Sequence, residues 1–209
     1  MGARKKKKIV FVCTGNTCRS PMAQFLLCQS LQTLELTGFE VLSVGICAKK
    51  GDVINPKSAQ VLLENGINAD GFTSTLLKEK LLTDAFALIC MTERQREYLM
   101  DARWNALRKL GKTQTEEVEN NVYSFAELTG YEILDPYGKE IDCYRYVYGL
   151  LSAGMPSVIE KLGLSTLAGA SPKKRGRPKK QTTMGEKPTP KKRGRPKKTL
   201  KNIQLEIKI

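Results

Sequence analysis

The fold of this chain follows from one stretch near its start, Val10-Phe-Val-Cys13-Thr-Gly-Asn-Thr-Cys-Arg19-Ser20-Pro21. An apolar, β-branched run reaches a cysteine, and a small polar loop follows. Ser20-Pro21 then predicts a helix with Ser20 as its N-cap and Pro21 at the first helical position. A strand, a tight loop and a helix in this order form the opening unit of a parallel α/β sheet. Ligands of such sheets bind beyond the carboxyl ends of the strands, which is where Cys13 and its loop lie.

The rest of the chain, to about residue 165, alternates apolar strand patterns with helical ones. Gly154-Met-Pro156 is expected to bend or interrupt the last helix. This order predicts an α/β fold: a three-layer sandwich with a central, four-stranded, parallel twisted sheet and helices on both faces. The expected strands are 7–12, 39–46, 86–91 and 122–125, and the expected helices are 20–35, 56–65, 76–82, one from about 93, and 141–162.

Charge is distributed unevenly along the 209 residues. The formal net charge is +14, yet residues 171–209 contain 15 of the 35 Lys and Arg residues and only 2 of the 21 acidic residues. The high net charge therefore belongs to the tail, and the body of the chain is close to neutral. We expect a basic N-terminal extension at 1–6, one domain at 7–165, and a disordered basic tail at 166–209.

The composition excludes several classes of protein. The chain has no histidine, which rules out Ser-His-Asp and Cys-His catalysis and removes the commonest ligand of catalytic zinc. No apolar run approaches the roughly 18 residues of a membrane span. The six cysteines are scattered, as free thiols are in a reducing compartment. We expect a cytoplasmic protein with no metal, no cofactor and no membrane partner.

Cys13 and Arg19 have the spacing Cys-x5-Arg. By itself this spacing is weak evidence, but its place between a buried strand and a helix start makes it specific. Consecutive backbone N–H groups of the loop would point at one anion, and phosphate suits such a site. The helix N-terminus and the Arg19 guanidinium favour the thiolate form of Cys13, to which the Ser20 hydroxyl could donate, and Asn16 could brace the loop. The predicted phosphate-binding residues are Thr14, Gly15, Asn16, Thr17, Cys18, Arg19 and Ser20.

Displacing a phosphoryl group also requires a proton donor for the leaving group, and Asp135-Pro-Tyr137 offers one. A proline next to the acid would stiffen the loop, and the aromatic ring could form a wall of the cleft. The same tripeptide is common in ordinary turns, so the phosphate loop is what makes Asp135 a candidate acid.

Val-Cys-Thr-Gly-Asn-Thr-Cys-Arg-Ser-Pro, with Asp-Pro-Tyr about 120 residues later, resembles the low-molecular-weight protein phosphatases, over about residues 7–163. The resemblance implies that Cys13 is a nucleophile that forms a phosphocysteine, and that Arg19 binds phosphate and stabilises the transition state. It also implies that Asp135 protonates the leaving group and then activates water. Asn16 and Ser20 would shape the loop and stabilise the thiolate.

Thr17 makes the resemblance sharper. Tyrosine phosphatases of this family typically carry an apolar β-branched residue at this position, whereas protein-arginine phosphatases carry threonine. A hydroxyl suits a polar guanidinium, and an apolar side chain suits a phenyl ring. Gly138 after Tyr137 also matches the arginine branch, although phenylalanine is usual there in place of Tyr137. We expect phosphoarginine as the substrate, with Thr17 and Tyr137 setting specificity; the alternatives are phosphotyrosine or a threonine that merely fits the loop.

Cys18 lies five residues after Cys13. In the resembled family such a neighbour forms a reversible disulfide that protects the nucleophile from over-oxidation. Cys18 is therefore a candidate redox partner, and a buried small side chain is the alternative. The related thioredoxin-coupled arsenate reductases also need a closely spaced cysteine pair near the middle of the chain. Only Cys90 lies there, and the next cysteine is Cys143, which disfavours that activity.

Two identical copies of Lys-Lys-Arg-Gly-Arg-Pro-Lys-Lys occupy 173–180 and 191–198. They resemble the AT-hook, which binds the minor groove of A·T-rich DNA. The extended, narrow Arg-Gly-Arg-Pro core lets two arginines enter the groove while the flanking lysines meet phosphates. A generic polyanion-binding tail or a nuclear localisation signal is the alternative. The predicted DNA contacts are Arg175, Gly176, Arg177, Pro178, Arg193, Gly194, Arg195 and Pro196.

The sequence as a whole predicts a monomeric phosphatase domain tethered to A·T-rich DNA, with a phosphorylated protein as its substrate. Its expected location is the cytoplasm, in association with the nucleoid. The alternative from another class is a DNA-binding protein whose domain is a vestigial phosphate-binding module. The intact set of Cys13, Arg19 and Asp135 disfavours that alternative.

Overall fold

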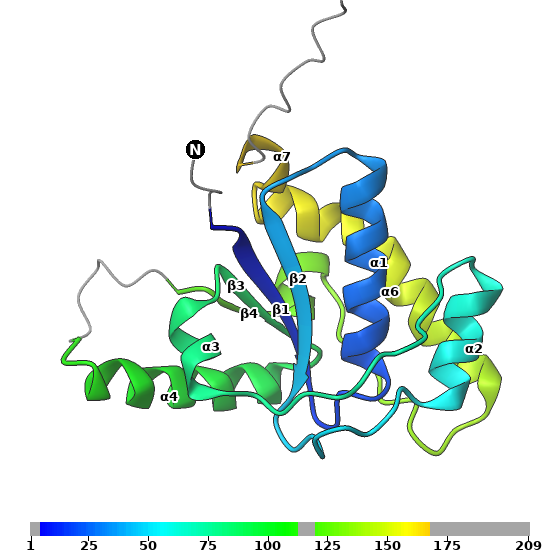
Figure 1. The fold of residues 1–209 in the computed structure, drawn as a ribbon, viewed down its shortest axis with the longest axis horizontal. Coiled ribbons are helices and arrows are strands. Elements are labelled where there is room, and N and C mark those ends of the chain that lie inside the picture. The colour runs from blue at the N-terminus through cyan, green and yellow to red at the C-terminus, as the bar shows by residue number, and fades with distance from the viewer. Residues whose placement is uncertain (1–4, 113–119, 168–209) are drawn as a thin grey trace, which may run out of the picture. The chain divides into compact units, whose positions relative to one another are not determined.

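A computed structural model of the protein describes residues 5–112 and 120–167. Residues 168–209, which contain both predicted DNA-binding repeats, lie outside the described residues, as do residues 1–4 of the N-terminal extension. The domain consists of a sheet with helices on both faces (Figure 1).

The sheet has four strands in the order β2-β1-β3-β4, and every neighbouring pair is parallel. This confirms the predicted sheet, with each strand within two residues of its expected bounds. β1, which leads to the cysteine loop, lies in the middle with a partner on each side. The strands are β1 (Lys7–Cys13), β2 (Phe39–Gly45), β3 (Ala87–Cys90) and β4 (Val122–Ser124).

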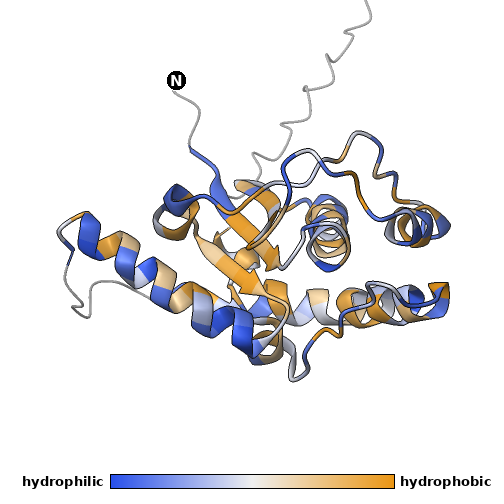
Figure 2. Cartoon of the chain, turned by 90° about the horizontal axis from the view of Figure 1, so that it is seen from below, coloured by the Kyte–Doolittle hydropathy of each residue, from blue (hydrophilic) through white to orange (hydrophobic). Residues whose placement is uncertain are grey.

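The helices divide between the two faces of the sheet. α1 and α6 pack against each other on one face together with α2, and α3 and α4 lie side by side on the other (Figure 1). In Figure 2 the strands are the most hydrophobic part of the ribbon, and α4 shows its hydrophilic side to solvent. The bounds are α1 (Arg19–Thr33), α2 (Pro56–Glu64), α3 (Glu79–Asp84), α4 (Glu93–Lys109), α5 (Phe125–Thr129), α6 (Ile141–Lys161) and α7 (Leu164–Leu167).

The alternation of side chains along β1 decides where the cysteine points. Ile9 and Phe11 lie in the core beneath α1 and α6, whereas Val10 and Val12 lie in the core beneath α3 and α4. Because successive residues of a strand face opposite sides, Cys13 belongs to the first set and faces α1. The strand is buried on both faces, as the central strand of a parallel sheet requires.

Ser20 is not the N-cap that the sequence predicted. α1 begins at Arg19, so Ser20 is the second helical residue and Cys18 stands at the N-cap without a capping side-chain hydrogen bond. The Ser20 hydroxyl lies instead against the Cys13 sulfur, where it cannot also cap the helix. The Ser-Pro pair therefore marks the start of the helix to within one turn, but the Ser20 hydroxyl contacts Cys13 and does not cap the helix.

Three other expectations were wrong in detail. α6 runs without interruption through Pro156, and Gly154 lets it pack closely on Phe125, because a Cβ there would lie 2.6 Å from the ring. Phe125 begins α5 and does not end a strand, since Ser124 and Glu127 form a capping box. α3 begins only at Glu79, because Leu76 and Leu77 pair with Gly45 as an extended segment.

Candidate active site

The cysteine loop, residues 14–18, is folded around Asn16. Its φ of 54° lies in the left-handed region, which asparagine tolerates better than most residues. The side chain is fully buried. Its Nδ2 donates to Ser20 Oγ and to Ser43 Oγ, both at 2.9 Å, and its Oδ1 accepts from the Thr75 amide at 2.8 Å. One side chain thus ties the loop to α1, to β2 and to the segment before α3.

The Cys13 sulfur lies at the bottom of this loop, 3% exposed. It is 3.0 Å from Ser20 Oγ and accepts a hydrogen bond from the Asn16 amide at 3.2 Å. Ser20 Oγ accepts from Asn16 Nδ2, and its single hydrogen is shared between the Cys13 sulfur at 3.0 Å and the Val44 carbonyl at 3.4 Å. The Asn16 amide, the Ser20 hydroxyl and the N-terminus of the 15-residue helix α1 therefore all lie around the Cys13 sulfur.

The loop also presents backbone donors. Within the described residues, the amides of Gly15, Thr17 and Cys18 donate no hydrogen bond. Unpaired amides at the start of a helix form an anion-binding concavity, and a phosphoryl group with three equatorial oxygens suits it. The predicted phosphate loop therefore has the backbone that such a role requires.

Arg19 and Asp135 meet across the site although 116 residues separate them in the chain. Arg19 Nη2 donates to Asp135 Oδ2 at 2.5 Å, and Arg19 Nη1 donates to the Ile133 carbonyl at 3.3 Å. The Ile133 amide in turn donates to the Met91 carbonyl beyond β3, which positions the loop. The Arg19 side chain is 5% exposed and that of Asp135 is 50% exposed, so the acid stands at the mouth of the site and the cation lies inside.

These groups line a cleft of about 550 Å³ at the carboxyl end of the sheet. Thr17 lies in it, and Tyr137, 69% exposed, stands on its rim. The lining is completed by the loop between β2 and α2. A larger cavity of about 620 Å³ lies between α1 and α6 at their C-terminal turns, but none of the predicted catalytic residues lines it. The cleft residues are Cys13, Thr14, Gly15, Thr17, Cys18, Arg19, Cys47, Lys49, Asp52, Val53, Ile54, Asn55, Pro56, Asp135 and Tyr137.

Cys18 shares the cleft, but its thiol is buried against Tyr144, whose hydroxyl lies 4.0 Å from Cys18 Sγ. Burial raises the pKa of the Cys18 thiol, and the hydroxyls of Thr17, Ser58 and Tyr144 offset this only in part. Burial likewise raises the pKa of Cys90, the last residue of β3. Both thiols are therefore harder to ionise than a free cysteine.

Several residues that shape the site escaped the sequence reasoning. Ser43 and Thr75 hold Asn16, and Gln95 Nε2 donates to Thr14 Oγ1 at 3.2 Å. At Gly45 a Cβ would lie 2.7 Å from the Thr14 carbonyl oxygen and 2.9 Å from the Asn16 amide. A glycine at the end of β2, the strand beside β1, was the only available signal for this close approach.

The described residues contain no group of three His, Cys, Asp or Glu side chains placed to hold a metal ion. None of the helices in 5–112 and 120–167 is long and apolar enough to cross a membrane.

The family model for the low molecular weight phosphotyrosine protein phosphatases matches residues 8–168. The chain belongs to this family. It is therefore a protein phosphatase, a hydrolase that acts on phosphorylated protein. The AT hook motif model matches residues 172–184 and 190–200, which contain the two repeats singled out in the sequence.

The relatives of this phosphatase include enzymes of both specificities. The protein-arginine-phosphatase of Geobacillus stearothermophilus is 34% identical over 155 residues, 74% of this chain and 95% of the relative. A probable low molecular weight protein-tyrosine-phosphatase, EpsP of Ralstonia nicotianae, is 29% identical over 75% of this chain and 96% of its own length. Among solved structures, a mutant of the YwlE arginine phosphatase with a phosphorylated active-site serine has a TM-score of 0.63 and 28% identity, over 75% of this chain and 95% of that one.

The close approach at Gly45 yields a prediction about the phosphate loop. Gly45→Ala places a methyl group against the backbone of Thr14 and Asn16, so the loop must shift by a fraction of an ångström. We expect kcat/KM for p-nitrophenyl phosphate to fall about a hundredfold, as misplacement of reacting groups does. Steady-state kinetics measure the loss of activity, and urea unfolding measures any change in the stability of the domain.

Gly149→Ala is the matched control, because Gly149 is exposed on α6 and a Cβ there meets nothing within 4 Å. It should leave kinetics unchanged and stabilise the helix by up to about 1 kcal/mol. Wild-type activity in Gly45→Ala would contradict the proposed contact between β2 and the loop.

Proposed function

We propose that this phosphatase hydrolyses phosphoproteins through a phosphocysteine on Cys13. The observation that carries the proposal is the convergence in one cleft of the Cys13 sulfur with two donors, the free loop amides, Arg19 and Asp135. The phosphorylated active-site serine in the mutant arginine phosphatase supports a covalent route in a related enzyme. The same convergence argues against a vestigial binding module.

In the first step the Cys13 thiolate attacks phosphorus, the bond from phosphorus to the substrate nitrogen or oxygen breaks, and Asp135 gives its proton to that departing atom. The loop amides and Arg19 hold the three equatorial oxygens as charge develops on them. In the second step a water attacks phosphorus, the Sγ–P bond breaks, and Asp135 takes the proton from the water. Inorganic phosphate leaves and the thiolate is restored.

We propose that substrate binding rearranges the Arg19–Asp135 ion pair. The guanidinium of Arg19 donates to the Asp135 carboxylate and to the Ile133 carbonyl. A bound phosphoryl group would offer the same two nitrogens a pair of oxygens, and Arg19 would then release Asp135. With Arg19 bound to the phosphoryl group, the Asp135 carboxyl group would be free to face the departing atom, as the first step requires. The Tyr137 amide, which donates to Asp135 Oδ1 at 3.2 Å, keeps the acid in place.

Phosphoarginine is the substrate we favour, and phosphotyrosine is the alternative. Thr17 lines the cleft with a hydroxyl where a phenyl ring would need an apolar neighbour. The 34%-identical relative that acts on protein arginine supports this choice. Tyr137 and the 68%-exposed Val53 give the rim an apolar surface for the aliphatic part of an arginine side chain.

We retain the other expectations about the domain as parts of this proposal. The catalytic domain spans 7–165, after a basic extension at 1–6 and before the tail at 166–209, and acts as a monomer. Cys18 is the redox partner of Cys13, and in support of this role both residues line the same cleft. The protein acts in the cytoplasm, at the nucleoid.

Thr17→Ile tests the substrate assignment. An isoleucine removes the hydroxyl and adds apolar surface, so the ratio of kcat/KM for phosphoarginine to that for phosphotyrosine should fall at least about tenfold. Peptides of one sequence that differ only in the phosphorylated residue give this ratio directly. Thr17→Ser keeps the hydroxyl and should keep the ratio, and an unchanged ratio in Thr17→Ile would remove Thr17 as a determinant.

We further propose that the two AT hook motifs bind the minor groove of A·T-rich DNA. The support is the match of the motif model at both repeats and the net positive charge of the tail. In each repeat two arginines flank a glycine that fits the groove floor, and a proline follows. α7, the last described element, lies near the end of the sheet at which β1 begins (Figure 1), whereas the cleft lies at the carboxyl end.

Replacing Arg175, Arg177, Arg193 and Arg195 by lysine tests this assignment at constant net charge. Lysine keeps the attraction to phosphates but lacks the planar, weakly hydrated guanidinium that enters a narrow groove. We expect the unmodified protein to bind an A·T-rich duplex at least about tenfold more tightly than a G·C-rich duplex of equal length, and the lysine variant to lose most of this preference.

Fluorescence anisotropy at fixed salt measures both affinities. Hydrolysis of p-nitrophenyl phosphate serves as the control for an intact catalytic domain. If the lysine variant kept its preference for the A·T-rich duplex, the tail would not be reading the groove through its arginines.

A further inference from the structure

The loop between β2 and α2, residues 46–55, contributes an acid to the cleft that the mechanism above does not use. Asp52 lines the cleft on the segment that leads to α2 and is half-buried. Its carboxylate makes no hydrogen bond or ion pair with any described residue. Asp135, the other acid of the cleft, is already bound to Arg19.

The backbone around Asp52 is held from both sides. Its amide donates to the Lys49 carbonyl at 3.3 Å, and its carbonyl accepts from the Ser74 amide at 2.7 Å. The next residue, Val53, forms a β-bridge with Thr73, and the Ser74 hydroxyl donates to the Lys49 carbonyl at 2.5 Å. The backbone of Asp52 is therefore fixed beside the cleft, so only the rotamer freedom of a short side chain is lost when the carboxylate binds a partner.

Lys49 is more exposed to solvent than Asp52. It lies on the same loop and lines the same cleft, but it is exposed and forms no ion pair with Asp52. A long, exposed side chain is solvated and loses rotamer freedom on binding, whereas a half-buried carboxylate without a partner has already lost part of its hydration. A ligand that places a cation beside Asp52 would therefore gain more binding free energy than one that places an anion beside Lys49.

We propose that Asp52 is a specificity residue that accepts a hydrogen bond from a cationic group of the substrate. This rests on the proposed phosphatase function of the cleft. The cation is either the guanidinium of phosphoarginine itself or the side chain of a basic residue beside the phosphorylated one. Both give the same charge-assisted hydrogen bond to the carboxylate.

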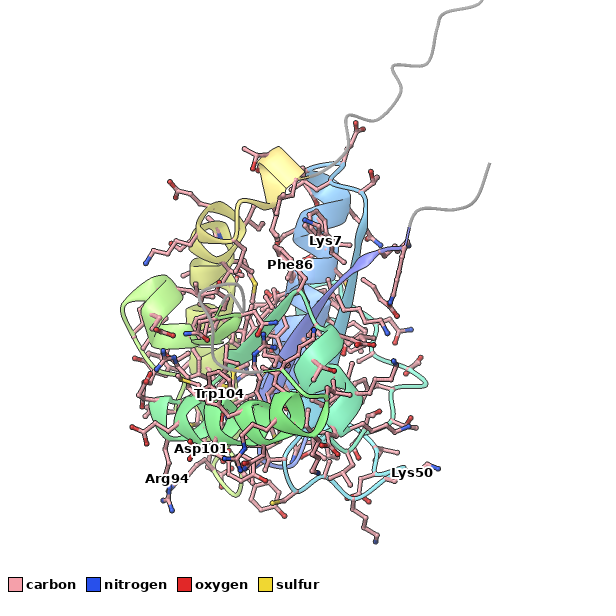
Figure 3. The ribbon with its side chains drawn as sticks, turned by 90° about the vertical axis from the view of Figure 1, so that its left-hand side faces the viewer. Lys7, Lys50, Phe86, Arg94, Asp101 and Trp104 are labelled. Carbon is pink, nitrogen blue, oxygen red and sulfur yellow. The ribbon has the colours of Figure 1, made fainter. Side chains whose placement is uncertain are left out.

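Asp52→Asn tests the proposal, because it keeps the shape of the side chain and removes the charge. Asp101→Asn is the matched control, since Asp101 lies on the outer face of α4, away from the cleft (Figure 3). The substrates are phosphoarginine and phosphotyrosine peptides, each with neutral neighbours or with lysine neighbours. For each, kcat/KM is divided by that for p-nitrophenyl phosphate in the same variant.

We expect Asp52→Asn to lower this ratio about fivefold for cationic substrates, mainly through KM, and the difference to shrink as salt is added. Loss on phosphoarginine with neutral neighbours identifies the guanidinium as the cation. Loss confined to lysine-bearing peptides, whichever residue is phosphorylated, identifies the neighbour. Asp101→Asn should change none of the ratios.

The proposal is overturned if Asp52→Asn moves no ratio more than Asp101→Asn does, or lowers all four ratios equally. The preference of the parent enzyme between phosphoarginine and phosphotyrosine is read from the same data. A preference for phosphotyrosine would contradict the proposed substrate, yet the lysine-bearing phosphotyrosine peptide would still test Asp52.

Discussion

The site depends on the buried side chain of Asn16. A loop that points its amides inward at an anion gives up the hydrogen bonds that those amides would otherwise form, so something else must hold its shape. Asn16 does this with three hydrogen bonds to Ser20, Ser43 and Thr75, from a left-handed backbone conformation. The same residue donates its amide to the Cys13 sulfur, which couples the shape of the loop to the charge of the nucleophile.

The sheet holds the cysteine loop in place, and contacts between distant parts of the chain bring Asp135 to it. β1 is paired on both sides up to Val12, and Cys13, the last residue of the strand, pairs with Gly45 of β2. Arg19 then reaches the loop of Asp135, which is attached to β3 through Ile133 and Met91. The cysteine loop and the loop of Asp135, which are far apart in the chain, are thereby held at the same cleft. This arrangement lets a short thiol, a cation and an acid act on one phosphorus atom in a protein without histidine.

Much of this could be predicted from the sequence, because the signals are local. The apolar run of β1, the small residues of the loop and the start of α1 lie within 15 residues, and the spacing of Cys13 and Arg19 follows from them. The contacts that fix the loop could not be predicted, because Ser43, Gly45 and Thr75 are ordinary residues whose meaning comes from tertiary packing. The sequence placed the Ser20 hydroxyl near the Cys13 sulfur correctly, but it also assigned Ser20 as the N-cap of α1, a position that Cys18 occupies. Pro156 does not interrupt α6, whose buried side chains pack on the core along its length.

The central claim is that the phosphoryl group passes through Cys13. The direct measurement is mass spectrometry of the acid-quenched Asp135→Asn variant after mixing with p-nitrophenyl phosphate, whose leaving group needs little help from an acid. The account predicts one phosphoryl group per enzyme, located on Cys13, and a matching burst of nitrophenol that is absent from Cys13→Ala. Turnover retained in Cys13→Ala, or a phosphoryl group found on another residue, would contradict it.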